Sequence, residues 1–252
     1  DKTLPEYRKR FGDVLVFSKS EIAKTFDEGD NFGDRRAIIY ARNACFELAQ
    51  QIGATHFIEL DDDYTYFKFR FDDQLRWHGA DVQDLDAVFD MLLDYFNSAP
   101  MLTLAIGQGG DYIGGEKATR FNDGIQPMRK AMNSFICSVD RPFQFIGRIN
   151  EDVNTYVLLG SRGGVFLSIL QIGLDQLETQ SNSGGMTELY LDAGTYVKSF
   201  YTVMYCPSCV VVSAMGTAHR RLHHHIKWRY AVPKILHESV KKVTTNGITP
   251  KQ

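Results

Sequence analysis

A short apolar segment, His56–Leu60, runs directly into three consecutive aspartates, Asp61, Asp62 and Asp63. Carboxylates on one short turn repel each other, so such a cluster needs a counter-ion or full solvation. A strand that ends in this turn delivers two or three hard oxygen ligands to one point, which suits Mg²⁺ or Mn²⁺ bound together with a diphosphate. A solvated acidic turn is the alternative, and the segments around the cluster decide between the two.

The composition is that of a globular protein. The chain has 252 residues, of which 44% are hydrophobic and 23% charged, enough for one large core. Because no apolar run approaches the roughly 18 residues that a membrane span requires, we expect no membrane partner. Four cysteines, Cys45, Cys137, Cys206 and Cys209, are too few to indicate a disulfide framework. The reducing cytoplasm is therefore the expected location.

Positive charge is concentrated near the C-terminal end of the chain. Residues 198–252 contain nine Lys and Arg but one acidic residue, Glu238, so this part carries +8 and the rest carries −11. The asymmetry indicates that the C-terminal part meets a polyanion, such as a diphosphate or nucleic acid. A basic surface without a partner has the same composition, so charge alone does not decide.

Hydrophobic periodicity predicts alternating helices and strands in the first half and more strands later. Apolar or small residues recur at helical spacing over 36–52, where Gly53 would end the helix, and over 85–96, before Pro100. Strict alternation over 65–71 predicts a strand with one apolar face. Further strands are predicted at 14–17, 56–60, 102–106, 135–139, 156–159, 197–204 and 210–215. The pattern favours an α/β sandwich with a mixed sheet.

Five motifs follow one another along this pattern. Arg42 and Asn43 lie in a predicted helix, the aspartate cluster ends a strand, and the glycine-rich segment 107–115 follows. Glu151–Asp152 comes next, and four histidines lie within residues 219–225. In this order the set resembles the glycosyltransferases of GT-A fold, which use nucleotide-diphosphate sugars.

The resemblance implies a GT-A-like three-layer sandwich with a mixed central sheet. It implies a single domain over residues 1–252, with a nucleotide-sugar half at about 1–115 and an acceptor half at about 116–252. Seven residues would bind the donor, with Asp62 facing outward: Arg42, Asn43, Asp61, Asp62, Asp63, Gly109 and Gly110. For Arg42 and Asn43, an ordinary solvent-facing helix turn is the alternative.

The same resemblance implies a divalent cation and a general base. Asp63 and Asp61, with His225 and His223, would bind Mn²⁺ or Mg²⁺, which neutralises the leaving diphosphate as a Lewis acid. Asp152 is the favoured base for an acceptor hydroxyl, and Glu151 would orient the acceptor. An acidic pair that only stabilises a helix N-terminus is the alternative for these two residues.

A closer resemblance lies in particular segments. Residues 149–156 (INEDVNTY), 179–186 (TQSNSGGM), 194–199 (GTYVKS), 226–229 (IKWR) and 233–235 (PKI) resemble the TET/JBP-associated glycosyltransferases. That family includes the base J glucosyltransferase and many phage enzymes. The resemblance implies transfer of a sugar, with UDP as the expected nucleotide of the donor and with inversion, to the hydroxymethyl group of a modified pyrimidine such as 5-hydroxymethylcytosine in DNA. It also implies a phage-encoded protein that acts in the host cytoplasm.

One departure from the family pattern concerns the first strand. Such folds open with a strand that grips the nucleotide, and residues 14–17 look like the second strand instead, which leaves the uridine contacts open.

The DNA acceptor has further support from basic and aromatic residues. Lysines and arginines near Trp228 suit phosphate contacts and base stacking, and residues 182–185 would form an acceptor loop, although a surface turn fits them equally. The candidate acceptor residues are Asn182, Gly184, Gly185, Lys198, Arg220, Lys227 and Trp228.

Other readings remain. Cys206, Cys209, His219 and His223 approach the spacing of a structural zinc site, but the apolar run 210–215 would hold the two pairs apart. Two alternatives to sugar transfer onto DNA remain: a glycosyltransferase of the same fold with a carbohydrate or small-molecule acceptor, and a non-catalytic DNA-binding module of the same fold. The glycine-rich segment lacks the GxxxxGK[ST] motif of the phosphate-binding loop, so a P-loop kinase or ATPase is not expected.

Overall fold

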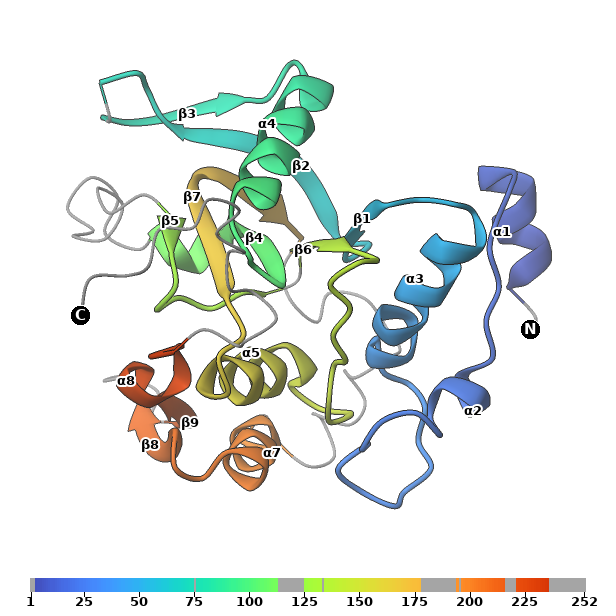
Figure 1. Cartoon of the computed structure of the whole chain (residues 1–252), viewed down its shortest axis with the longest axis vertical. Coiled ribbons are helices and arrows are strands. Elements are labelled where there is room, and N and C mark those ends of the chain that lie inside the picture. The colour runs from blue at the N-terminus through green and yellow to red at the C-terminus, as the bar shows by residue number, and fades with distance from the viewer. Residues whose placement is uncertain are drawn as a thin grey trace, which may run out of the picture.

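The computed structural model describes residues 3–74, 76–112, 125–132, 134–177, 194, 196–215 and 221–235. Figure 1 shows the arrangement of the helices and strands in these ranges. The helices are α1 (Leu4–Phe11), α2 (Lys19–Ile22), α3 (Ile39–Gln51), α4 (Leu85–Ser98), the 3₁₀ helix η1 (Gly109–Tyr112), α5 (Glu151–Ser161), α7 (Val197–Tyr205) and α8 (Trp228–Ala231). The strands are β1 (His56–Leu60), β2 (Tyr64–Phe71), β3 (Trp77–Asp81), β4 (Thr103–Gln108), β5 (Ile125–Gln126), β6 (Ser134–Ser138), β7 (Phe166–Gln176), β8 (Val210–Met215) and β9 (Arg221–Ile226).

A seven-stranded mixed sheet forms the centre of the described part of the chain. Its order is β1-β6-β4-β7-β2-β3, and β5 pairs with β7. The β4–β7 pair is parallel, with Leu104 opposite Leu167, whereas the other pairings are antiparallel. The α/β class and mixed sheet predicted from the sequence are confirmed.

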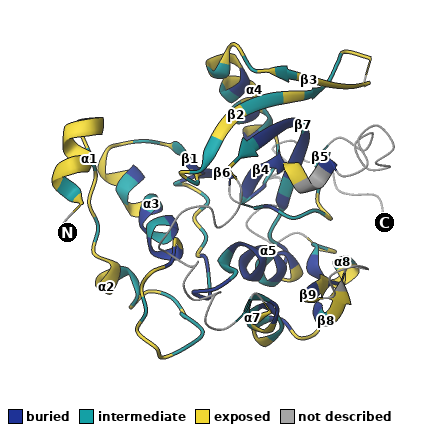
Figure 2. Cartoon of the chain, turned by 180° about the vertical axis from the view of Figure 1, so that it is seen from behind, coloured by how far each residue is buried: buried dark blue, intermediate teal, exposed yellow. Residues whose placement is uncertain are grey.

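Helices cover both faces of this sheet, which gives the GT-A-like three-layer arrangement. On one face, α4 buries Leu92 and Phe96 against Leu104 and Ile136. On the opposite face, α3 and α5 pack against Ala105, Phe135 and Cys137, so neighbouring residues of one strand serve different layers. Figure 2 shows the buried, dark-blue strands β4 and β7 between these helices. Full burial of each such Leu or Phe side chain contributes about 1.5–3 kcal/mol.

Local signals explain where the two best-predicted helices begin and end. The Asp84 carboxylate accepts a hydrogen bond from the Ala87 backbone N–H and so caps the start of α4. Gly53 follows α3 with a φ of +73°, a left-handed conformation that glycine adopts without strain. The sequence prediction of these helices, over 85–96 and 36–52, is confirmed apart from a few residues at the ends.

Strands β8 and β9 form a separate antiparallel hairpin beside α7. Val212 lies opposite His224, and Val211 lies opposite His225. Although neighbouring residues of a strand usually point to opposite faces, the rings of His223 and His224 lie together, with their centres 4.2 Å apart. His224 is buried, while His225 is exposed.

Three predicted strands are wrong. Residues 14–17 form no strand and lie in an irregular segment between α1 and α2. Residues 156–159 belong to α5, and residues 197–204 belong to α7. A short apolar run does not distinguish a strand from a helix. Helix α5 has such a run because it is buried on several sides, whereas α7 exposes part of its run, at Phe200 and Met204.

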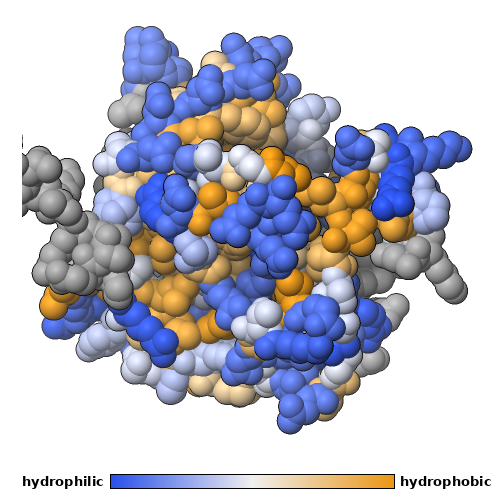
Figure 3. All heavy atoms as spheres, turned by 45° about the vertical axis from the view of Figure 1, so that its right-hand side comes forward, coloured by the Kyte–Doolittle hydropathy of each residue, from blue (hydrophilic) through white to orange (hydrophobic). Residues whose placement is uncertain are grey.

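The surface away from the core is mixed. Helix α1 has no buried residue and exposes Tyr7 and Phe11. In Figure 3, which brings the right-hand side of Figure 1 forward, hydrophobic and hydrophilic side chains are interspersed over the visible face. None of the described helices is long and apolar enough to cross a bilayer.

Candidate active site

Arg42 is the centre of the candidate site. Helix α3 directs this side chain inward, where the residue is 3% exposed. Its Nη2 atom lies 2.9 Å from Asp61 Oδ1, and its Nε atom lies 3.4 Å from Glu151 Oε1. The guanidinium also stacks over Phe135, at 4.7 Å from the ring centre. One buried cation thus joins the aspartate cluster after β1 to the acidic start of α5.

Four carboxylates surround this guanidinium. Glu59 lies in β1 and Asp61 directly follows the end of that strand, while Glu151 and Asp152 begin α5. All four contribute to the electrostatic environment of Arg42, whose pKa they raise although burial lowers it. The site therefore gathers four acidic groups around one guanidinium, a surplus that a further cation would offset.

Burial raises the pKa of three of these acids, and the charge of Arg42 opposes the rise. The pKa is about 6 for Asp61, about 7 for Glu151 and about 8 for Glu59. Groups whose pKa lies near neutrality exchange protons readily at physiological pH, and they cluster at functional sites.

Glu59 was not anticipated from the sequence. Its two carboxylate oxygens are buried and have no hydrogen-bond partner among the described residues, and the residue is 7% exposed. An acidic residue within an apolar strand, two positions before Asp61, was the signal that could have found it.

A tight turn aims the start of α5 at Arg42. Asn150, directly before Glu151, has a φ of +62°, a left-handed conformation that asparagine tolerates better than most residues. Its side-chain amide donates to Thr202 Oγ1 at 2.6 Å, and that hydroxyl donates to Asn154 Oδ1 at 2.8 Å. Asn154 in turn donates to the carbonyls of Ile146 and Ile149. The buried polar network thereby fixes the turn against α7.

The aspartate cluster has one exposed and two partly buried members. Asp62 is exposed, as expected, while Asp61 and Asp63 are partly buried. Asp63 Oδ1 is buried without a hydrogen-bond partner among the described residues, and burial raises the pKa of Asp63. An orphaned carboxylate oxygen beside Asp61 fits a hard divalent cation such as Mg²⁺ or Mn²⁺.

The histidines do not complete a protein-only metal centre in the described structure. No group of three or more His, Cys, Asp and Glu residues is arranged to hold a metal ion in the part of the chain that the structure describes. Magnesium commonly takes one or two protein carboxylates and completes its shell with substrate phosphates and water. Asp61 and Asp63 fit this arrangement, whereas the metal role of His223 and His225 stays a prediction. For the zinc alternative, Cys206 and Cys209 are buried free thiols, and His219 lies outside the described residues.

Asn43 has a structural role next to Arg42. Its amide donates to the Phe145 carbonyl at 3.0 Å and accepts from the Phe145 backbone N–H at 2.8 Å. This pair of bonds attaches the segment before α5 to α3. The predicted donor contact of Asn43 is not tested, but both ends of its amide already have partners.

The glycine-rich segment begins at the end of β4. Gly109 and Gly110 open η1, and Gly109 is exposed. The preceding Gln108 donates to the hydroxyl of Tyr64, which follows Asp63 directly, so the segment starts near the aspartate cluster.

Among the candidate acceptor residues that the structure describes, Lys198 is influenced by the charges of the site acids. Burial lowers the pKa of Lys198, and the charges of Asp152 and Glu151 oppose this change. Lys227 is exposed. Trp228 stacks on Tyr156 of α5, with ring centres 5.8 Å apart, and packs partly buried against the core. Asn182, Gly184, Gly185 and Arg220 lie outside the described residues.

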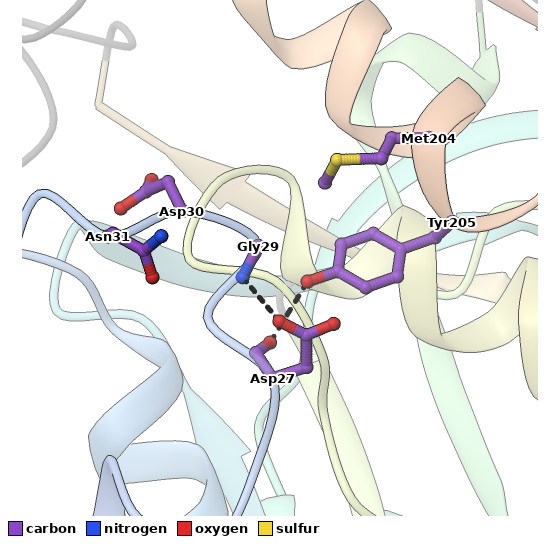
Figure 4. A pocket seen from close by; sticks show the side chains of 6 residues that line it. All are labelled: Asp27, Gly29, Asp30, Asn31, Met204 and Tyr205. Atoms are coloured by element: carbon purple, nitrogen blue, oxygen red, sulfur yellow. Dashed lines mark hydrogen bonds between the residues drawn. The ribbon is translucent and has the colours of Figure 1, made fainter.

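A second polar network, also unanticipated, lies beside the turn before α5. Arg148 is 1% exposed, and its Nη2 atom donates to Asp30 Oδ2 at 2.6 Å. Although burial raises it, hydrogen bonds from Arg148 and Tyr201 hold the pKa of Asp30 below its ordinary value. Figure 4 shows the adjacent pocket of about 340 Å³, in which the side chains of Tyr205 and Met204 face the Asp27–Asn31 loop. Its lining is Asp27, Gly29, Asp30, Asn31, Met204 and Tyr205.

Comparison with known proteins identifies the family. No curated protein and no solved structure matches the chain. The profile of one family, described as TET-Associated Glycosyltransferase, matches residues 1–185, which include Arg42, the aspartate cluster and the Glu151–Asp152 pair. The chain therefore belongs to the TET-Associated Glycosyltransferase family.

Proposed function

We propose that this glycosyltransferase moves a sugar from a nucleotide-diphosphate donor, with UDP as the expected nucleotide, to the hydroxymethyl group of a modified pyrimidine in DNA. The family supports sugar transfer linked to DNA modification. The proposal rests on two ion pairs of the buried Arg42 side chain, one with Asp61 and one with Glu151. These ion pairs bring two acidic motifs from distant parts of the sequence to one centre.

In this proposal the donor diphosphate lies at the aspartate cluster. Asp61 and Asp63 would hold Mg²⁺ or Mn²⁺, which when bound supplies Lewis-acid neutralisation of the leaving diphosphate. Arg42 balances the carboxylates and orients Asp61 through the 2.9 Å contact. Gly109, which has no side chain to obstruct approach, lies near the donor sugar.

Asp152 is the proposed general base. The acceptor hydroxymethyl oxygen attacks the anomeric carbon of the sugar, the bond from that carbon to the diphosphate oxygen breaks, and the hydroxyl proton passes to the Asp152 carboxylate. Glu151, held by Arg42, orients the acceptor. A single displacement of this kind inverts the configuration at the anomeric carbon.

The test is a transfer assay on the whole protein. The chain is incubated with Mn²⁺, each of a panel of UDP-sugars, and an oligonucleotide that contains 5-hydroxymethylcytosine or 5-hydroxymethyluracil. We expect the mass of one modified base to rise by one sugar residue, while the matched oligonucleotide with unmodified cytosine stays unchanged. Transfer to a carbohydrate but to neither oligonucleotide would refute the DNA acceptor, and absence of donor turnover with any acceptor would refute the enzymatic proposal.

A further inference from the structure

Helix α7 presents an uncovered apolar face. Tyr196 directly precedes the helix, and Phe200 and Met204 follow at intervals of four residues, so the three side chains lie on one face. All three are exposed, and the rings of Tyr196 and Phe200 meet edge to face with their centres 6.0 Å apart. A row of large apolar side chains at this spacing is typical of a surface that packs against another helix. We call Tyr196, Phe200 and Met204 the α7 face.

The α7 face ends at the pocket shown in Figure 4. Met204 lies on one wall of this pocket, and the Asp27–Asn31 loop forms the opposite wall. The lining includes Asp27 and Asp30 but no lysine or arginine. Arg148 balances the charge of Asp30, whereas none of the described lysines and arginines forms an ion pair with Asp27. The apolar surface therefore leads to a carboxylate that can take a cation.

The carboxylate of Asp27 is held in place before any partner arrives. The Asp27 carbonyl accepts hydrogen bonds from the Tyr205 hydroxyl at 3.0 Å and from the Gly147 backbone N–H at 2.9 Å, and the carboxylate Oδ1 accepts from the Gly29 N–H at 2.8 Å. Gly29 itself lies so close to α7 that an added Cβ would be 2.7 Å from the Tyr205 hydroxyl oxygen. A preorganised group loses little freedom when it binds, which favours its use in recognition.

Helix α1 is a second feature without a partner. It has eight residues and none of them is buried. Because isolated helices shorter than about 12–15 residues are marginal in water, α1 gains most of its stability only when it packs against something. Its exposed Tyr7 and Phe11 rings lie one turn apart, with centres separated by 5.8 Å, and Arg8, Lys9 and Arg10 lie in its last turn.

The two features complement each other in shape and charge. Helix α1 offers an aromatic pair beside three cations, and the α7 face offers apolar side chains beside Asp27. A guanidinium and a carboxylate form charge-assisted hydrogen bonds, often two at once. Figures 1 and 2 show α1 and α7 at separate parts of the molecule, so this contact would join two copies. In a two-fold arrangement each copy supplies both features, and the contact forms twice.

We propose that two copies of this chain associate by packing α1 of one copy on the α7 face of the other, with an arginine of α1 at Asp27. The proposal uses none of the candidate catalytic or donor-binding residues, so it does not depend on the proposed function. Two contacts between short helices form a small interface, so the dimer dissociates on dilution.

The first experiment measures the mass of the full chain by sedimentation over a wide range of protein concentration. We expect a reversible equilibrium between monomer and dimer, and Met204→Asp should raise its dissociation constant at least about tenfold, because a carboxylate replaces an apolar contact. The matched control is Met91→Asp on α4, since Met91 is 48% exposed and Met204 is 53% exposed. A monomer at every concentration, or an equal effect of the two substitutions, would overturn the proposal.

The second experiment tests the pairing of charges. We expect Arg8→Glu combined with Arg10→Glu to raise the dissociation constant at least about tenfold, since like charges then meet at Asp27, and the further substitution Asp27→Lys to restore most of the affinity. Failure of a folded triple variant to recover would overturn the pairing. If α1 variants stay dimeric and lose only oligonucleotide binding, α1 serves DNA and the proposal is wrong.

A third measurement locates the contact without any substitution. Methyl NMR signals of Met204 and Met91 in the full chain are followed on dilution. We expect the Met204 signal to shift with the fraction of dimer and the Met91 signal to stay constant. A dimer whose dissociation leaves the Met204 signal unchanged would use another surface and would contradict the proposal.

Discussion

Arg42 forms ion pairs with two acidic segments, so its replacement should lower the free energy of unfolding by an amount that depends on pH. The side chain is 4% exposed where it meets Asp61 and Glu151. Removing one partner of a buried ion pair typically costs about 3–5 kcal/mol, because the remaining charges lose their counter-ion. We expect Arg42→Met, which has similar length, to lower the free energy of unfolding by this amount at pH 8 and by less at pH 5, where the carboxylates take up protons. Urea unfolding at both pH values measures it, and an equal loss at both would point to packing instead.

Glu59 should make the fold less stable as the pH rises. Its folded pKa of about 8 lies above the ordinary 4.5, so the folded state binds the proton more tightly and its penalty grows from about pH 4.5 to about pH 8. Glu59→Gln keeps the shape without this penalty. We expect the variant to gain on the order of 1–3 kcal/mol over the natural chain at pH 8, with little difference at pH 4.5. Chemical denaturation across this range checks it, and a variant that is less stable at every pH would contradict the prediction.

Asp63 and Asp62 offer a matched pair for the cation proposal. Asp63 has a buried orphan oxygen, whereas its neighbour Asp62 is exposed. We expect Asp63→Asn to weaken Mn²⁺-dependent UDP binding at least about tenfold, because a carboxylate ligand is lost, and Asp62→Asn to leave it unchanged. Calorimetry with and without EDTA measures both. UDP binding that is insensitive to EDTA in the natural chain would exclude a metal-held diphosphate.

Asp152 is predicted to act on the chemical step and not on donor binding. We expect Asp152→Asn to lower kcat about 10²–10⁴-fold, the usual contribution of a general base, and to leave the affinity for UDP unchanged. Single-turnover transfer and UDP titration separate the two effects. Full transfer by this variant would remove Asp152 from the mechanism and leave Glu151 as the remaining candidate of the pair.

The start of α5 determines where Glu151 and Asp152 point. Asn150 holds a φ of +62° and donates a hydrogen bond to Thr202. Asn150→Ala should cost about 1–2 kcal/mol, because a side chain with a Cβ and no polar group is strained in the left-handed region, and it should also reduce transfer. Asn150→Gly relieves the strain but loses the same hydrogen bond. If both variants lose transfer while only the alanine variant loses stability, the hydrogen bond to α7 positions the acids.

The same helix shows what sequence could predict at the scale of elements. Helix α4 and strand β2 are amphipathic, so their hydrophobic periodicity was sufficient to predict both elements from the sequence. The Asp84 cap is consistent with the start of α4. Helix α5 buries Asp152, Asn154, Thr155 and Val157 on several sides, so no apolar stripe marks it, and residues 156–159 alone suggested a strand. Its ends depend on contacts with α7 and the 146–149 segment, which lie far along the chain or outside the helix.

At the scale of the whole molecule, the candidate site forms where three distant segments meet. The sequence order of Arg42, the aspartate cluster and Glu151–Asp152 was enough to suggest a shared centre. It did not indicate that Arg42 would be the buried counter-ion of these acids, nor that Glu59 would be buried near them, because both depend on the packing of α3, β1 and α5. The Arg148–Asp30 pair was missed because its two residues lie far apart in the sequence. A charged side chain can be buried only where other groups pair with it, and the fold determines which groups lie close enough to do so.

Charge separation over the whole chain predicts how DNA should bind. The net charge is −3, but residues 198–252 carry +8, so attraction to DNA must come from a limited surface while the acidic remainder repels the strand. Each phosphate neutralised contributes about 0.7–0.9 to the slope of log affinity against log salt concentration. The described cations of this region are Lys198, Arg221, Lys227, Arg229 and Lys234. If three of them each neutralise one phosphate, we expect a slope of about −2 to −3, and Arg221→Gln should reduce its magnitude by nearly one. Fluorescence anisotropy between 50 and 200 mM salt, roughly the range in which such slopes are measured, provides the data. A slope near zero would mean that bases, and not phosphates, supply the binding energy, and the basic C-terminal region would then have no part in holding the acceptor.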